Sequence, residues 1–202
     1  MTNTHRITMK VVLFTVTEGR FMTFLSGNRI PECDLARGYT LEGQVDSCIK
    51  QSLGLSSADG FIEQLYTISE SKDAPSITVV YYMLIAPDQI PQANRRAWAD
   101  VFTIKKSQID NKLLMYAVQR LQWKIEYTNV VYSLLPLQFT LGELQRVYEA
   151  ILHKSLDKRN FRKKILSLGM IKDVQKKRKL GRARPAEVYT FINRKLTIVQ
   201  IL

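Results

Sequence analysis

The sequence predicts two domains: an N-terminal α/β (α+β) domain with a mixed β-sheet, and a C-terminal domain of two short helices followed by a β-hairpin. Three observations predict this. Runs of β-branched residues fill the first two thirds, two capped helical segments follow the helix-resistant step at Leu135-Pro136, and the charge is uneven. Residues 136–202 hold 16 Lys and Arg against 5 Asp and Glu, a net of +11, whereas residues 1–135 hold 14 against 13. We therefore expect domains at 1–135 and 136–202, the second of which meets a polyanion.

The composition narrows the class of protein further. With 202 residues, 46% hydrophobic and 24% charged, the chain is globular and has enough apolar material for a core. Cys33 and Cys48 are the only cysteines and His5 and His153 the only histidines, which argues against a disulfide scaffold or a Cys/His metal site. The longest apolar run, residues 77–86, is too short for a bilayer, and no signal peptide is recognisable. We expect a cytoplasmic protein without membrane association, bound metal or cofactor.

The N-terminal domain begins with a predicted hairpin. Residues 9–17 and 20–25 read as strands around a turn at Glu18-Gly19, and residues 35–41 read as a loop or a short strand. From Gln44 the spacing becomes helical, and Gly54 is placed to end the helix. Its apolar face comprises Val45, Cys48, Ile49 and Leu53.

Three more strands and a long helix complete this domain. Residues 61–68, 77–86 and 98–104 are predicted strands, and the second is apolar on both faces, which favours a central position. Residues 111–127 are predicted to form a helix that joins the two domains. Its apolar stripe comprises Leu114, Val118, Leu121 and Ile125.

The C-terminal third has the pattern of a helix-turn-helix. Thr140 and Glu143 form a capping box, and the helix they open is expected to end near His153. Asp157 is a good N-cap for a second helix over 158–168, with Gly169 as its stop. Phe161, Ile165 and Leu168 would face inward, whereas the exposed side would be basic. The exposed residues expected to contact DNA are Lys158, Arg159, Asn160, Arg162 and Lys163.

A β-hairpin wing is expected to follow, which makes this domain a winged helix. Residues 170–174 and 187–192 are predicted strands, the second with Val188, Tyr189, Phe191 and Ile192 as its apolar residues. The loop over 175–185 would grip phosphates, while Asn160, Arg162 and Lys163 approach base edges in the major groove. The loop residues expected to bind DNA are Lys176, Lys177, Arg178, Lys179, Arg182 and Arg184.

Two other interpretations of the basic third stay open. A run of Lys and Arg taken alone is more often a solvated face or a localisation patch than a DNA-binding wing. RNA binding is a second alternative, but the segment lacks the exposed aromatic platform that recognition of single strands usually needs. The capped helices before the run and the strand after it favour duplex DNA.

The helix that ends at Gly54-Leu55 resembles the helix of the Nudix fold. A working Nudix box reads R-E-apolar-x-E-E-x-G-apolar, and its glutamates hold Mg²⁺ against a pyrophosphate. Aligned on Gly54-Leu55, the arginine position is Ser47 and the glutamate positions are Cys48, Gln51 and Ser52. The resemblance therefore implies a Nudix-like domain that is not an enzyme. Cys48 lies on the apolar face and is expected to be a buried, inert thiol.

The whole chain resembles the Nudix-related transcriptional regulators, the NrtR-like family. The motifs that carry the resemblance are LLPLQFTLGELQ (134–145), VYEAIL (147–152), LDKRNFRKKIL (156–166) and RPAEVYTF (184–191), and looser matches lie at 65–67, 72–75 and 97–98. The segment 72–75 reads KDAP where the family usually has RDPR.

This resemblance implies a homodimeric bacterial repressor. Its winged helix would bind a palindromic operator, and its Nudix-like domain would bind an NAD-related metabolite such as ADP-ribose, or a sugar. Candidate effector contacts are Arg37, Tyr39, Lys72 and Asp73. The alternative is a Nudix-type hydrolase of nucleoside diphosphate derivatives with a nucleic-acid-binding arm, which the missing glutamates disfavour.

Overall fold

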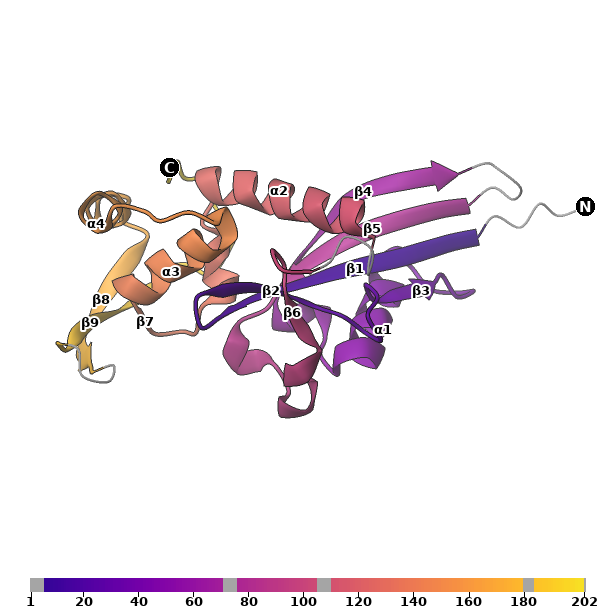
Figure 1. Ribbon diagram of the computed structural model, residues 1–202, viewed down its shortest axis with the longest axis horizontal. Coiled ribbons are helices and arrows are strands. Elements are labelled where there is room, and N and C mark those ends of the chain that lie inside the picture. Colours follow the sequence, from indigo (N-terminus) through magenta and orange to yellow (C-terminus); the bar gives the residue numbers. More distant parts are fainter. Residues whose placement is uncertain (1–5, 71–75, 105–109, 180–183, 202) are drawn as a thin grey trace, which may run out of the picture. The chain divides into compact units, whose positions relative to one another are not determined.

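The computed structural model describes residues 6–70, 76–104, 110–179 and 184–201 (Figure 1). Within these ranges the chain divides into two compact units. The first lies in Met1–Thr15, Met22–Ile85 and Gln89–Ala117, and the second lies in Val16–Phe21, Ala86–Asp88 and Val118–Leu202. This division does not test the domain boundary expected between residues 135 and 136, which stays a prediction.

A mixed β-sheet, as predicted, organises the N-terminal part. Its strands follow one another in the order β4-β5-β1-β2-β6, and β3 also pairs with β1. β1 and β5 run parallel, whereas the β1–β3, β2–β6 and β4–β5 pairs are antiparallel. The strand bounds are β1 (Arg6–Thr17), β2 (Arg20–Phe24), β3 (Glu32–Asp34), β4 (Phe61–Glu70), β5 (Ser76–Leu84) and β6 (Trp98–Asp100). β5 is an inner strand, which confirms the prediction from its two apolar faces.

Helix α1 (Leu41–Leu53) carries the predicted buried face. Val45, Cys48, Ile49 and Leu53 are at most 2% exposed and pack into a core with residues of β1 and β5. The helix begins three residues before the expected Gln44, because the Thr40 hydroxyl accepts a hydrogen bond from the Gly43 N–H at 3.1 Å. Gly54 ends it as predicted, with a φ of 75° that favours glycine.

One predicted strand is shorter in the structure, and one segment with two expected conformations is a loop. The strand expected over 98–104 ends at Asp100, because the Asp100 carboxylate accepts from the Phe102 N–H at 3.0 Å and turns the chain. In the segment expected as a loop or short strand at 35–41, the structure has a loop up to the start of α1, and the short strand β3 comes before it.

Helix α2 (Asn111–Tyr127) has the predicted bounds, and its predicted apolar stripe is buried. The 3-10 helix η4 (Val130–Leu134) follows it. The C-terminal segment returns to this region, where the Val199 and Ile201 N–H groups donate to carbonyls of Tyr127 and Glu126. The Arg194 guanidinium donates to the carbonyl oxygens of Leu135 (2.8 Å), Pro136 (3.2 Å) and Tyr132, and burial lowers its pKa.

The two helices and the hairpin predicted for the winged helix are present. Helices α3 (Leu141–Leu152) and α4 (Lys158–Ser167) are followed by β8 (Ile171–Arg178) and β9 (Ala186–Phe191), and β9 also pairs with β7 (Phe139–Thr140). The capping box is present: the Thr140 N–H donates to Glu143 at 2.7 Å, and the Glu143 N–H donates to the Thr140 hydroxyl at 3.2 Å. Asp157 caps α4 through the Asn160 N–H at 2.7 Å.

The wing departs from the prediction in two ways. β8 continues to Arg178, so Lys176, Lys177 and Arg178 lie on a strand and not in the loop expected over 175–185. A bulge at Gln175, with φ 58° and its N–H bonded to Asp173 at 2.7 Å, lets the strand continue past the expected end. Ile192 is 60% exposed and follows β9, so it is outside the core. At the end of α4, Leu168 was expected to face inward but is only half-buried. No helix in the described ranges is long and apolar enough to span a membrane.

Candidate nucleic-acid interface

Helix α4 presents the predicted basic surface. Phe161 and Ile165 are buried, so the rest of the helix faces outward. Phe161 packs edge-on against Tyr148 of α3, with ring centroids 5.3 Å apart, and this contact sets the orientation of α4 on α3. The exposed predicted residues are Lys158, Arg159, Asn160, Arg162 and Lys163.

Arg162 is held by the wing. Its Nη2 lies 3.3 Å from a carboxylate oxygen of Glu187 on β9, and the same oxygen accepts from the Tyr189 hydroxyl at 2.8 Å. The pKa of Tyr189 is raised, first by burial and then by this hydrogen bond. Because a guanidinium has five N–H donors, Arg162 keeps most of them for an external acceptor while Glu187 fixes its direction.

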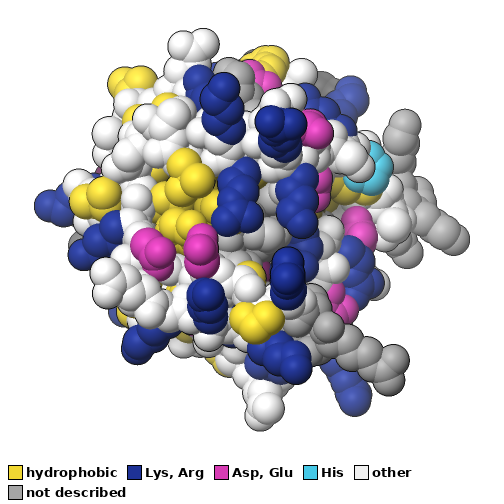
Figure 2. Space-filling model, turned by 90° about the vertical axis from the view of Figure 1, so that its left-hand side faces the viewer, with side chains coloured by type: hydrophobic (Ala, Val, Ile, Leu, Met, Phe, Trp, Pro, Cys, Tyr) yellow, Lys and Arg dark blue, Asp and Glu magenta, His cyan; other side chains and the backbone are white. Residues whose placement is uncertain are grey.

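Arg178 has an internal role that the sequence did not show. Its guanidinium lies 3.3 Å from Glu143, the acidic residue of the α3 capping box, and donates to the Gln138 carbonyl at 3.0 Å. Arg178 is half-buried, whereas Lys176, Lys177 and Lys179 are exposed, as is Arg184 before β9. Arg182 lies outside the described residues. Many Lys and Arg side chains lie on the side of the molecule that carries α4, β8 and β9, with hydrophobic and a few acidic side chains between them (Figure 2).

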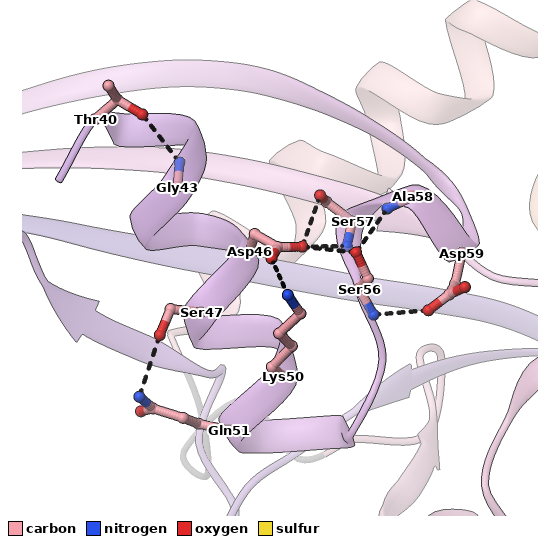
Figure 3. Close-up of polar contacts among 10 residues, drawn as sticks. All are labelled: Thr40, Gly43, Asp46, Ser47, Lys50, Gln51, Ser56, Ser57, Ala58 and Asp59. Carbon is pink, nitrogen blue, oxygen red and sulfur yellow. Dashed lines mark hydrogen bonds and ion pairs between the residues drawn. The ribbon is translucent and has the colours of Figure 1, made fainter.

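In the N-terminal domain, α1 is the helix that resembles the Nudix helix. Asp46, which precedes the box positions, fixes this helix through several hydrogen bonds and an ion pair. Asp46 accepts from the Ser56 hydroxyl, the Ser57 N–H and the Ser57 hydroxyl at 2.8, 2.8 and 2.9 Å, and its other oxygen lies 2.7 Å from Lys50 Nζ (Figure 3). Lys50 first, and then the Ser57 and Ser56 donors, hold the pKa of Asp46 far below its usual range. These contacts tie α1 to the segment that follows it.

The four box positions contain no carboxylate, and two of them bond to each other. The Gln51 amide donates to the Ser47 hydroxyl at 3.3 Å (Figure 3). Cys48 is 2% exposed, next to Cys33, and burial raises the pKa of its thiol, as expected for an unreactive cysteine. No group of three His, Cys, Asp or Glu side chains within the described ranges is arranged to hold a metal ion.

The structure places only half of the candidate effector contacts. Arg37 and Tyr39 are exposed in the loop before α1, with Tyr39 54% exposed and close to the first turn of α1. Lys72 and Asp73 lie outside the described residues. Whether these four residues meet at one site therefore stays a prediction.

Comparison with known proteins assigns the C-terminal part. Residues 131–191 match the family model of the NrtR DNA-binding winged helix domain. The chain is 28% identical to an "ADPR responsive transcriptional repressor NtrR" of Acinetobacter baylyi, over 92% of this chain and 81% of that protein. A solved structure of Shewanella oneidensis NrtR in complex with a 27mer DNA superposes with a TM-score of 0.77 at 25% identity, covering 92% of this chain and 93% of that one. Residues 131–191 therefore match the DNA-binding domain of NrtR, and the chain as a whole is similar to NrtR-type repressors.

The fold of this chain is also similar to that of another solved structure. A MutT/nudix family protein from Enterococcus faecalis superposes with a TM-score of 0.70 over 95% of this chain and 88% of that one, at 18% identity. The fold is therefore a Nudix-like domain with a mixed sheet and a C-terminal winged helix.

Three contacts in this chain have no sequence signal. Glu187 and Glu143 lie 25 and 35 residues from the arginines they bind, and Asp46 lies 10 and 11 residues from Ser56 and Ser57. Spacing reveals partners one helical turn apart, but not partners that tertiary packing brings together.

Proposed function

We propose that the protein is a transcriptional repressor whose winged helix binds operator DNA and whose Nudix-like domain binds a small effector that controls this binding. The observation that carries the proposal is the winged helix at residues 131–191, which matches the NrtR DNA-binding family model and carries exposed cations on α4 and on the β8–β9 hairpin. ADP-ribose is the first effector to test, because the Acinetobacter baylyi relative is named as responsive to it.

The geometry supports a division of labour within the winged helix. Asn160, Arg162 and Lys163 are exposed on α4, the second helix of a helix-turn-helix, which is the helix that enters the major groove in such folds. Arg pairs bidentately with guanine and Asn with adenine, so these residues would read bases. Lys176, Lys177, Lys179, Arg182 and Arg184 would hold phosphates, and Arg178 would add to them while it braces the wing against α3.

Replacing Arg162 and Lys177 separates base reading from phosphate binding. Arg162→Ala should lower the preference for a palindromic duplex selected by the wild-type protein over random duplex by about 5- to 150-fold. Lys177→Ala should weaken both duplexes about equally and reduce the slope of log affinity against log salt by about 0.9. Lys164→Ala, on α4 but outside the predicted set, is the matched control. Filter binding of all variants at several salt concentrations measures both quantities, and identical behaviour of Arg162→Ala and Lys177→Ala would contradict the assignment.

The Nudix-like domain is proposed to bind its effector without hydrolysing it. Mg²⁺ needs carboxylate oxygens, and the box positions hold Ser47, Cys48, Gln51 and Ser52 instead. Release of AMP from ADP-ribose in the presence of Mg²⁺ tests this, and clear turnover would favour the hydrolase alternative. A thermal-shift series with ADP-ribose, other NAD metabolites, phosphorylated sugars and free pentoses identifies the effector, because a ligand of the folded state raises the melting temperature.

A palindromic operator calls for two winged helices related by a twofold axis, so the proposed repressor acts as a homodimer.

A further inference from the structure

Acidic side chains are scarce in the basic third, and the backbone uses four of the five. Residues 136–202 contain five Asp and Glu against 16 Lys and Arg. Four of these acids each accept a hydrogen bond from a main-chain N–H group, so a helix cap, a loop or a turn requires them. These four residues are Glu143, Glu149, Asp157 and Asp173.

Glu187, the fifth acid, bonds to side chains and to no main-chain N–H group within the described ranges. One of its carboxylate oxygens lies 3.3 Å from Arg162 Nη2 and accepts from the Tyr189 hydroxyl at 2.8 Å. Lys177 is opposite Glu187 in the register of β8 and β9, yet the carboxylate pairs with Arg162 of α4. The acid that the backbone does not need therefore lies beside a cation proposed to read bases.

Neither stability nor affinity accounts for an acid at this place. The side chains of Arg162 and Glu187 are 50% and 46% exposed, and an ion pair so exposed adds little to the free energy of unfolding. In the proposed complex a carboxylate close to α4 also repels phosphates, which lowers the affinity for every duplex. What Glu187 supplies is a direction for the guanidinium.

Tyr189 holds the carboxylate in turn. Glu187 and Tyr189 are two residues apart on β9, so their side chains lie on one face of the strand. Tyr189 is 6% exposed, so packing fixes its ring while its hydroxyl reaches the carboxylate. The position of Arg162 is therefore set from the buried side of the wing through Tyr189 and Glu187.

We infer that Glu187 is a positioning residue, which aims the Arg162 guanidinium at a guanine in the major groove and keeps it from the phosphates of other DNA. Guanine offers N7 and O6 to two N–H groups of one guanidinium, so this pairing needs a defined plane and direction. A phosphate contact carries no sequence information, so an arginine that is not held binds DNA of any sequence. The inference rests on the proposed function, because it requires that α4 reads operator bases.

Glu187→Gln should move two affinities in opposite directions. Binding of random duplex should tighten by about three- to tenfold at about 50 mM salt, and the slope of log affinity against log salt should steepen by up to about 0.9, because Arg162 gains a phosphate. The preference for a palindromic duplex selected by the wild-type protein over random duplex should fall by about fivefold or more. Mere disturbance of the wing would instead weaken binding of both duplexes.

Tyr189→Phe tests the orientation without changing the charge. It removes the hydroxyl that fixes Glu187 and should lower the preference by about threefold, while binding of random duplex stays within about twofold of the wild type. In the double variant Arg162→Ala/Glu187→Gln, the preference should match that of Arg162→Ala within about twofold, because Glu187 acts through Arg162.

Glu126→Gln is the matched control, because it removes one exposed acid from another element, α2, and should leave the preference unchanged. Filter binding of both duplexes at several salt concentrations measures the affinities, and circular dichroism checks that each variant is folded. The inference fails if Glu187→Gln keeps the wild-type preference, weakens both duplexes equally, or lowers the preference as much without Arg162 as with it.

The same measurements separate this inference from the proposed function. If Arg162→Ala lowers the preference and Glu187→Gln does not, the inference fails and the proposed function stands. If the wild-type protein binds no duplex, or selects none from a random pool, the proposed function fails and the inference fails with it.

Discussion

At the scale of single residues, carboxylates decide how the cations of the basic third point. Glu187 and Arg162 are about half exposed, so their ion pair orients the guanidinium more than it stabilises the fold. The Arg178–Glu143 pair is less exposed and shares its carboxylate with the α3 capping box, so it adds to the wing's stability as well. Arginines that look alike in the sequence therefore have different tasks.

Asp46 makes a prediction about pH. Its pKa is lowered in the folded protein, first by Lys50. Its contacts therefore stabilise the fold fully at a pH above the unfolded pKa of about 3.9. This stabilisation is lost as the pH falls through the pKa of Asp46 in the folded protein. Asp46→Asn should lower the melting temperature at pH 7 by about 2–4 °C, corresponding to about 1 kcal/mol. The difference from wild type should shrink as the pH falls below about 4.

Thermal melts of both proteins at pH 7, 5 and 3.5 measure this. Lys50→Gln is the companion variant, because it removes the ion pair and leaves the donors of Ser56 and Ser57 in place. A melting difference that stays constant from pH 7 to pH 3.5 would show that Asp46 does not act through its charge.

At the scale of elements, capping residues specified where the helices begin and end. Thr140, Asp157 and Gly54 act as the caps that their positions predict. The end of β8 was not predictable, because Lys176 and Lys177 have the composition of a loop, and pairing with β9 beyond the bulge keeps them in a strand. The length of β8 therefore depends on its partner strand, through the pairs Lys177–Glu187 and Arg178–Ala186.

Gly60 shows a constraint at the start of β4. A Cβ atom at this position would lie 2.3 Å from the Leu84 carbonyl oxygen and 2.8 Å from the Met83 side chain, so the neighbouring strand would have to move. Gly60→Ala should lower the free energy of unfolding by about 2 kcal/mol or more. Gly43→Ala in α1, where the Cβ has space 3.4 Å from the Thr40 hydroxyl, should leave stability unchanged or raise it by up to about 1 kcal/mol. Urea unfolding measures both, and equal effects would contradict the close approach.

At the scale of the whole molecule, the excess positive charge lies outside the Nudix-like domain. Residues 1–135 carry a net of +1 and residues 136–202 a net of +11, so the attraction to a polyanion arises in the winged-helix part. This distribution lets an effector of either charge bind the Nudix-like domain without competing directly for the cations of the wing.

Coupling between the proposed sites must be reciprocal. If ADP-ribose weakens binding of the selected palindromic duplex by a given factor, the duplex should weaken binding of ADP-ribose by the same factor, about 5- to 150-fold for a coupling of about 1–3 kcal/mol. Titration calorimetry of ADP-ribose with and without saturating duplex checks this equality. An affinity for ADP-ribose that does not change when duplex is bound, while ADP-ribose changes duplex binding, would show that the two effects do not come from one equilibrium.

The sequence by itself determined the bounds of α2, the caps of the winged helix and the loss of carboxylates from the Nudix box. These features depend on residues near one another in the chain, where spacing and capping have a direct physical meaning. Only the tertiary structure decided that Arg162 and Arg178 bind glutamates, that Asp46 ties α1 to Ser56 and Ser57, and that Ile192 is exposed. These outcomes depend on groups that folding brings together from distant positions, and their partners are set by packing and not by spacing.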